Sequence, residues 1–290
     1  MNKKFACRDF LRSIYMVEGK NISMKSALLV VSFGTSYEET RKKTIEAIEQ
    51  DLATAFPERT FYRAWTSERI RKKLRETRGI SYDNVEEAME RMLQDKITDV
   101  LIQPTHMMTG VEFETTRNTI VSYRDRFDTL RMGAPLLAGE EDLVYLAKVL
   151  EEIFSDIKDS EMLALMGHGS SHTSFPAYEL LGGQLKKDGY PNFCVGTVEY
   201  EPGFETVRRQ VQERKPDQVY LTPLLVVAGD HAVNDMAGDS PDSWKSKLEK
   251  EGASPVCIVK GMGEYREIRD LYIEHARNAG LIPASNKSSV

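Results

Sequence analysis

Three of the five histidines follow stretches that we expect to be β-strands, namely His168, His172 and His231. His168 lies between two glycines, which let the backbone turn sharply and let another molecule approach the imidazole closely. His231 follows Asp230 at the end of an apolar stretch. Acidic neighbours orient an imidazole and raise its basicity, as they do around many metal ligands. These patterns predict histidines that bind a metal ion or accept a proton.

Glu199 ends the stretch at residues 192–198, which we expect to be a strand, and its carboxylate should lie at the same edge as the histidines. Two imidazoles and one carboxylate suit cobalt, nickel, iron or zinc, with coordination positions left open for exchange. His106, in the corresponding loop of the first half, is a further residue that could touch a ligand. His275 lies in the last predicted helix and is expected to be structural.

The sequence motifs of serine hydrolases and of ATP-binding proteins are absent. Ser170 and Ser171 adjoin the first histidine loop, but no G-x-S-x-G sequence places a serine at a nucleophile elbow. No G-x-x-x-x-G-K-[ST] motif is present, so we expect neither an ATP-driven reaction nor an organic cofactor. The 3 cysteines form no C-x-x-C pair and make a poor disulfide framework.

The elements that must position these residues alternate between short β-branched or aromatic runs and amphipathic stretches, which is typical of a parallel sheet covered by helices. Ligands of such sheets lie beyond the carboxyl ends of the strands. We expect strands near 27–33, 59–65, 98–104, 129–135, 161–166, 192–198, 217–223 and 254–260. We expect helices near 37–55, 83–95, 112–127, 141–156, 175–188, 203–214, 240–251 and 264–279.

The two halves of the chain resemble each other. Residues 31–36 (V-S-F-G-T-S) align with 166–171 (M-G-H-G-S-S), and 103–112 aligns with 222–231 around a shared proline and glycine. This predicts an α/β fold of two similar lobes, each a four-stranded mostly parallel sheet flanked by helices, with a cleft between them. We place an N-terminal extension at 1–25, the first lobe at 26–140 and the second lobe, with the metal site, at 141–290.

Composition restricts the partners. A net charge of -6 does not favour nucleic acid, which needs a basic surface. No apolar run is long enough for a membrane span, and the N-terminus does not resemble a secretory signal. We therefore expect a cytoplasmic protein without membrane or nucleic-acid partners, and, because such assemblies are common, a homo-oligomer.

Over residues 26–280 the chain resembles the anaerobic sirohydrochlorin cobaltochelatase family, relatives of ferrochelatase that work as single-subunit enzymes without ATP. The resemblance rests on four motifs. They are VVSFGTS at 30–36, MGHGS at 166–170, GTVE at 196–199 and GDHAVNDMAGD at 229–239.

The resemblance implies a lyase that forms metal–nitrogen bonds by inserting a divalent metal, Co²⁺, into sirohydrochlorin in anaerobic cobalamin biosynthesis. It assigns metal binding to His168, Glu199 and His231, with His168 as principal base and His231 as a second proton acceptor. Insertion of Fe²⁺ or Ni²⁺ into the same tetrapyrrole remains an alternative, because such ligands do not choose between these ions. A binding protein that stores or delivers a metal or tetrapyrrole is the alternative from another class.

Sirohydrochlorin carries many carboxylates, and an acidic protein needs local cations to bind it. Arg41, Arg63, Arg117 and Arg124 are candidates for this role, although each taken alone fits a solvated helix face or strand end better, and the sequence does not identify which basic residues bind the carboxylates.

Overall fold

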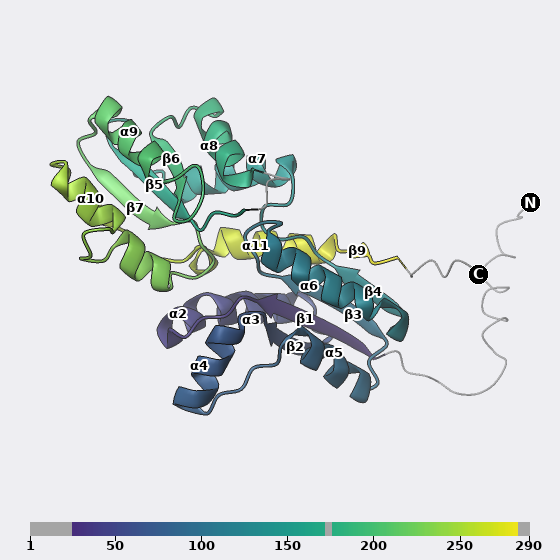
Figure 1. Cartoon of the computed structure of the whole chain (residues 1–290). Coiled ribbons are helices and arrows are strands. Elements are labelled where there is room, and N and C mark those ends of the chain that lie inside the picture. Colours follow the sequence, from purple (N-terminus) through teal and green to yellow (C-terminus); the bar gives the residue numbers. More distant parts are fainter. Residues whose placement is uncertain (1–24, 172–175, 284–290) are drawn as a thin grey trace, which may run out of the picture.

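The computed structural model describes residues 25–171 and 176–283. The predicted extension at 1–25 therefore lies outside the described residues except for Lys25, and so does His172. Figure 1 shows two lobes, each built around a sheet with helices against it. This architecture confirms the predicted fold class. Among the described residues, no helix combines the length and the apolar character needed to cross a bilayer.

The first lobe contains a five-stranded sheet in the order β2-β1-β3-β4-β9. Its first four strands are parallel, whereas β9 is antiparallel to β4. The central strand, β1, is covered on both faces, because its alternate residues enter two different apolar clusters. The strands are β1 (Ser26–Ser32), β2 (Thr60–Trp65), β3 (Asp99–Pro104), β4 (Thr129–Met132) and β9 (Gly280–Leu281).

The second lobe contains a four-stranded parallel sheet in the order β6-β5-β7-β8. Both lobes thus place their first strand between their second and third. The register agrees with the sequence repeat, since Val31 pairs with Pro104 in one lobe and Met166 pairs with Pro223 in the other. The strands are β5 (Met162–Gly167), β6 (Phe193–Thr197), β7 (Val219–Pro223) and β8 (Val256–Cys257).

Helices connect the strands close to the predicted positions. The stretch at 37–55 is two helices rather than one, because Thr44 leaves the helical conformation (φ -117°, ψ -80°). The helices are α2 (Glu38–Lys43), α3 (Ile45–Ala55), α4 (Glu68–Arg78), α5 (Val85–Gln94), α6 (Val111–Ser122), η1 (Arg124–Arg126), α7 (Glu140–Ile153), α8 (Ala177–Lys187), α9 (Phe204–Arg214), η2 (His231–Met236), α10 (Trp244–Lys250), η3 (Met262–Glu264) and α11 (Arg266–Arg277).

Helix α4 was not predicted, because its sequence ERIRKKLRETR offers almost no apolar stripe. Its ends nevertheless carry standard signals. The Ser67 side chain accepts a hydrogen bond from the N–H of Ile70, and Gly79 ends the helix in the left-handed conformation (φ 67°). These caps, rather than hydrophobic periodicity, mark the helix in the sequence.

The C-terminal segment differs from the predicted division at residue 140. Strand β9 pairs with β4, and α11 packs on α3 and β3 of the first lobe while also touching α7. In Figure 1, α11 runs between the two lobes. The buried side chains of α11 explain this return, because Leu271 and Tyr272 join an apolar cluster that is continuous across both lobes.

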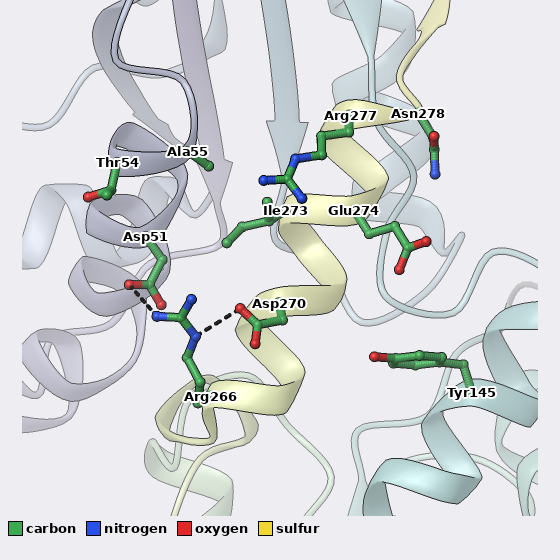
Figure 2. A pocket seen from close by; sticks show the side chains of 10 residues that line it. All are labelled: Asp51, Thr54, Ala55, Tyr145, Arg266, Asp270, Ile273, Glu274, Arg277 and Asn278. Carbon is green, nitrogen blue, oxygen red and sulfur yellow. Dashed lines mark hydrogen bonds and ion pairs between the residues drawn. The ribbon is translucent and has the colours of Figure 1, made fainter.

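Polar contacts fix α11 in place. The Tyr272 hydroxyl donates to the carbonyl of Thr105 (3.0 Å), and Arg269 Nε donates to Asp51 Oδ2 of α3 (2.7 Å). Figure 2 shows the Arg266 side chain of α11 reaching toward Asp51 of α3 and toward Asp270 of its own helix. These contacts tie α11 to the first lobe, and the helix also contacts α7 of the second lobe.

Candidate metal centre

The predicted ligands follow three neighbouring strands of the second sheet. His168 comes directly after β5, Glu199 follows β6 by two residues, and His231 opens η2 beyond β7. Because these strands are parallel and β5 lies between the other two, their carboxyl ends meet at one edge of the sheet. The structure brings the three side chains together there.

The ligand atoms of this set are close enough to share one ion. One nitrogen or oxygen from each of His168, Glu199 and His231 lies within 4.8 Å of the others. The two imidazole centroids are 4.9 Å apart at an angle of 82°, and His168 Nε2 lies 3.8 Å from Glu199 Oε1. Ligands bonded at about 2.1 Å to one ion lie at most about 4 Å apart, so a shift of under about 1 Å closes the set.

Hydrogen bonds orient both imidazoles. His231 Nδ1 lies 2.6 Å from Asp235 Oδ2, and His168 Nδ1 lies 3.1 Å from the carbonyl of Gly169. Both partners are acceptors, which places a proton on Nδ1 and leaves the Nε2 lone pair of each ring for a metal or a proton.

Close packing explains the glycines around His168. A Cβ on Gly167 would lie 2.4 Å from the ring of Tyr178, and Gly169 adopts φ +92° with Tyr200 N 3.0 Å from its would-be Cβ. The N–H of Glu199 donates to the carbonyl of His168 (3.1 Å). The G-H-G sequence therefore fixes the histidine loop against the glutamate loop.

His231 lies in a π-helix, a form often found at functional sites. The N–H of Ala237 donates to the carbonyl of Ala232, five residues earlier (3.2 Å). The wider turn sets His231 and Asp235 on one face, in contact through their side chains. The sequence run at 229–239 thus provides both the predicted ligand His231 and the carboxylate that orients it.

The three ligands open into a cleft of about 650 Å³ lined by both lobes, which is a usual size for a small-molecule site. Much of the first-lobe wall is apolar and suits a flat organic ring. Its apolar lining includes Phe33, Ile45, Ile70, Met107, Met108, Val111 and Phe113.

His106 lines this cleft but is separate from the metal set. Both of its ring nitrogens are buried, and neither has a hydrogen-bond partner among the described residues. Burial lowers the pKa of His106 to about 4, so the ring is neutral at physiological pH. It packs edge-on against Phe113, with ring centroids 6.1 Å apart.

His275 is structural, as expected. Its Nε2 lies 3.0 Å from Asp142 Oδ1, which joins α11 to the start of α7. Burial raises the pKa of Asp142, but hydrogen bonds from His275 and from the backbone of Ala138 outweigh this effect and hold the pKa of Asp142 below its ordinary value. The contact is largely buried and lies outside the cleft.

The four arginines predicted to bind substrate carboxylates have other partners. Arg41 and Arg63 donate to first-lobe carboxylates at 2.8 and 2.5 Å, and Arg117 lies 4.0 Å from another. Arg124 donates to two backbone carbonyls. None of the four lines the cleft, so this prediction is wrong. The cations that do line it, Arg69 and Lys73, lie on the unpredicted helix α4.

A second cavity of about 640 Å³ lies between α3, α7 and α11 (Figure 2). It is lined by residues of mixed charge, including Asp51, Arg266 and Arg277, and no histidine is among the described residues that line it. Among the described residues, the set of His168, Glu199 and His231 is the one group with metal-ligand geometry. We therefore place the functional site in the interlobe cleft.

Comparison with known proteins gives a consistent result. A family model described as cobalt chelatase (CbiK) matches residues 26–280. A sirohydrochlorin cobaltochelatase of Salmonella typhimurium is 38% identical over 256 residues, covering 88% of this chain and 97% of that protein. The sirohydrochlorin cobaltochelatase CbiKC of Nitratidesulfovibrio vulgaris is 30% identical over 254 residues, covering 87% and 89%.

Solved structures show the same fold. The structure of SirB from Bacillus subtilis with Fe³⁺ matches with a TM-score of 0.61 at 14% identity, covering 88% of this chain and 95% of that one. CbiX, described as the terminal enzyme of siroheme biosynthesis in denitrifying bacteria, matches with a TM-score of 0.52 at 17% identity, covering 87% and 98%.

Proposed function

The chain belongs to the cobalt chelatase (CbiK) family, and from this premise we propose that it inserts Co²⁺ into sirohydrochlorin without ATP. His168, Glu199 and His231 hold the ion before transfer. The observation that carries the proposal is the convergence of their three ligand atoms within 4.8 Å at the wall of a cleft of about 650 Å³. The cleft gives the tetrapyrrole a place directly beside the ion.

The reaction exchanges one divalent ion for two pyrrole N–H protons. While the ion is bound, the Nε2 atoms of His168 and His231 are ligands. Once the ion passes to the ring nitrogens, both lone pairs become free, and each imidazole accepts one proton. Two histidines therefore account for both protons, one on His168 and one on His231.

The carboxylates of Glu199 and Asp235 offset positive charge during this exchange. Glu199 lowers the net positive charge of the bound ion as its third ligand. Asp235, 2.6 Å from His231 Nδ1, holds that ring in place and balances the imidazolium that forms after transfer. The site loses the two positive charges of the ion and gains one on each imidazole. Its net charge therefore changes little during the reaction.

The donor set itself does not select cobalt. Nitrogen and oxygen ligands also bind Fe²⁺ and Ni²⁺, and cells choose among these ions by supply as well as by affinity. Cobalt is proposed because of the family and the curated relatives.

An anaerobic absorbance assay tests the proposal. Purified protein is mixed with excess sirohydrochlorin and with Co²⁺, Fe²⁺ or Ni²⁺ in turn, without ATP, and each rate is compared with the reaction lacking protein. We expect many equivalents of cobalt product per protein chain. Metallation that stops near one equivalent would identify a carrier instead, and a faster rate with iron or nickel would reassign the metal.

A further inference from the structure

The lining of the cleft contains very few permanent positive charges. Among its described residues, Arg69 and Lys73 are the two with a permanent cation. Both belong to α4 and are four residues apart, so they lie one turn apart on the same face of the helix. Ile70, between them, also lines the cleft.

Backbone contacts fix α4 at the edge of the cleft. The helix begins just after β2, at the carboxyl edge of the first sheet. The N–H of Thr66 donates to the carbonyl of Ser32 (2.9 Å), and the N–H of Ser67 donates to that of Phe33 (3.1 Å). The start of α4 is therefore tied to the loop that follows β1.

Side chains on the opposite face of α4 anchor it to the lobe. Arg71 is buried, and its guanidinium donates to Glu68, to Glu87 and to the carbonyl of Tyr82 at 2.9 to 3.0 Å. Leu74 is also buried. Arg69 and Lys73 therefore belong to a helix that is packed firmly against the lobe, and not to a loop.

Arg69 and Lys73 are available to a ligand. Both are exposed, and among the described residues no carboxylate lies within 4.0 Å of either charged group. Lys73 Nζ donates to Ser36 Oγ (3.2 Å), a neutral contact that orients the amine toward the first cleft loop. In contrast, the adjacent Lys72 does not line the cleft and pairs with Glu76 at 3.9 Å.

The negative charges of the cleft come from other elements. Glu112 lies at the start of α6, Glu199 follows β6, and Asp230 precedes η2. These carboxylates repel an anionic substrate, whereas α4 attracts it. A polyanionic ring in this cleft therefore has a preferred orientation, with a carboxylate-bearing edge at α4.

We propose that Arg69 and Lys73 bind peripheral carboxylates of the tetrapyrrole and thereby orient the ring in front of the metal ligands. This inference rests on the proposed function, because it takes sirohydrochlorin as the substrate. The Arg69 guanidinium can bind one carboxylate through two parallel N–H bonds, and Lys73 adds a point charge one turn away. The two are positioning residues, since the chemistry stays with His168 and His231.

Steady-state kinetics with Co²⁺ and sirohydrochlorin test the assignment. We expect Arg69→Gln and Lys73→Gln each to raise KM by about five- to tenfold, and the double variant by more, because charge-assisted hydrogen bonds are lost. kcat should stay within about twofold. Lys72→Gln is the matched control, and it should leave both parameters at wild-type values.

Salt dependence gives a second readout that a purely structural role would not change. The wild-type KM should rise with KCl concentration, and the double variant should show a clearly weaker rise because two of the screened contacts are absent. Conservative Arg69→Lys should recover part of the lost affinity. Circular dichroism verifies that all variants fold, as expected for exposed side chains.

The outcomes separate this inference from the proposed function. If wild-type protein metallates no sirohydrochlorin, the proposed function fails and takes this inference with it. If wild-type protein turns over and the folded double variant keeps the wild-type KM and salt dependence, the inference alone is overturned. A fall in kcat at unchanged KM would also overturn it, because the residues would then act on the chemistry.

Discussion

The imidazole of His106, whose two nitrogens are buried, should make the fold sensitive to acid. Burial lowers its pKa to about 4 in the folded protein, against an ordinary value of about 6.5 when unfolded. Between these values the unfolded chain binds a proton that the folded protein does not. Stability is therefore complete above pH 6.5 and is lost as the pH falls toward 4. At pH 4.5 the loss amounts to about 2.5 kcal/mol.

A second buried group acts in the opposite direction over nearly the same range. Burial raises the pKa of Glu49 to about 7 despite the neighbouring Arg63, so the folded protein keeps a proton that the unfolded chain releases. This group stabilises the fold at low pH and loses that contribution as the pH rises toward 7. The wild-type profile combines both effects, and a His106 variant is needed to separate them.

Two variants isolate the histidine. His106→Gln removes the titration but keeps a polar side chain, whereas His106→Leu also removes the two buried nitrogens, which have no hydrogen-bond partner in the described part of the chain. Urea denaturation in EDTA at pH 4.5 and 7.5 gives the free energy of unfolding. The free energy of unfolding of each variant, relative to wild type, should be about 2.5 kcal/mol more favourable to the folded state at pH 4.5 than at pH 7.5. For His106→Leu, the free energy of unfolding should rise by a further increment of about 1 to 3 kcal/mol at both pH values.

The result that refutes this reasoning is a difference from wild type that is the same at both pH values. It would mean that His106 is protonated alike in the folded and unfolded chain. The ring would then have a partner or water contact that the described residues do not supply.

Three further outcomes follow from the geometry. His168→Gln should abolish Co²⁺ binding in calorimetry and lower insertion by at least about a hundredfold, with an unchanged melting temperature, and near wild-type turnover would remove it from the site. Asp235→Asn should weaken Co²⁺ binding by about ten- to a hundredfold in the same titration, and equal affinity would show that the carboxylate does not orient its histidine. Gly167→Ala should lower the free energy of unfolding by about 1 to 3 kcal/mol in urea denaturation, because its Cβ would lie 2.4 Å from Tyr178. Gly183→Ala, at an open position in a helix, should raise the free energy of unfolding by about 0.5 to 1 kcal/mol. Equal effects of the two glycine changes would contradict the packing described around the histidine loop.

Hydrophobic patterning was sufficient to predict most of the fold. The strand predicted at 161–166 is observed at Met162–Gly167, and the helix predicted at 264–279 at Arg266–Arg277. Buried parallel strands read as continuous apolar runs, and this signal is local. The two-residue strand β9 has no such signal, because its pairing with β4 depends on where α11 carries the chain.

The convergence of His168, Glu199 and His231 was also accessible to sequence reasoning, because each follows a strand of a parallel sheet. The carboxyl ends of such strands meet at one edge whatever the length of the intervening helices. The cations of the cleft were not accessible in this way. Nothing in the sequence distinguishes Arg69 from Arg41 as a residue of the cleft. Only the packing of α4 against the loop after β1 places Arg69 in the cleft lining, from which Arg41 is absent. The burial of the His106 nitrogens likewise depends on tertiary packing.

Anomalous diffraction at the cobalt edge from a Co²⁺-soaked crystal tests the central claim most directly. We predict one strong peak in the interlobe cleft, about 2.0 to 2.2 Å from Nε2 of His168, Nε2 of His231 and a carboxylate oxygen of Glu199. A peak at His106 or His275, with the cleft ligands empty, would contradict the account.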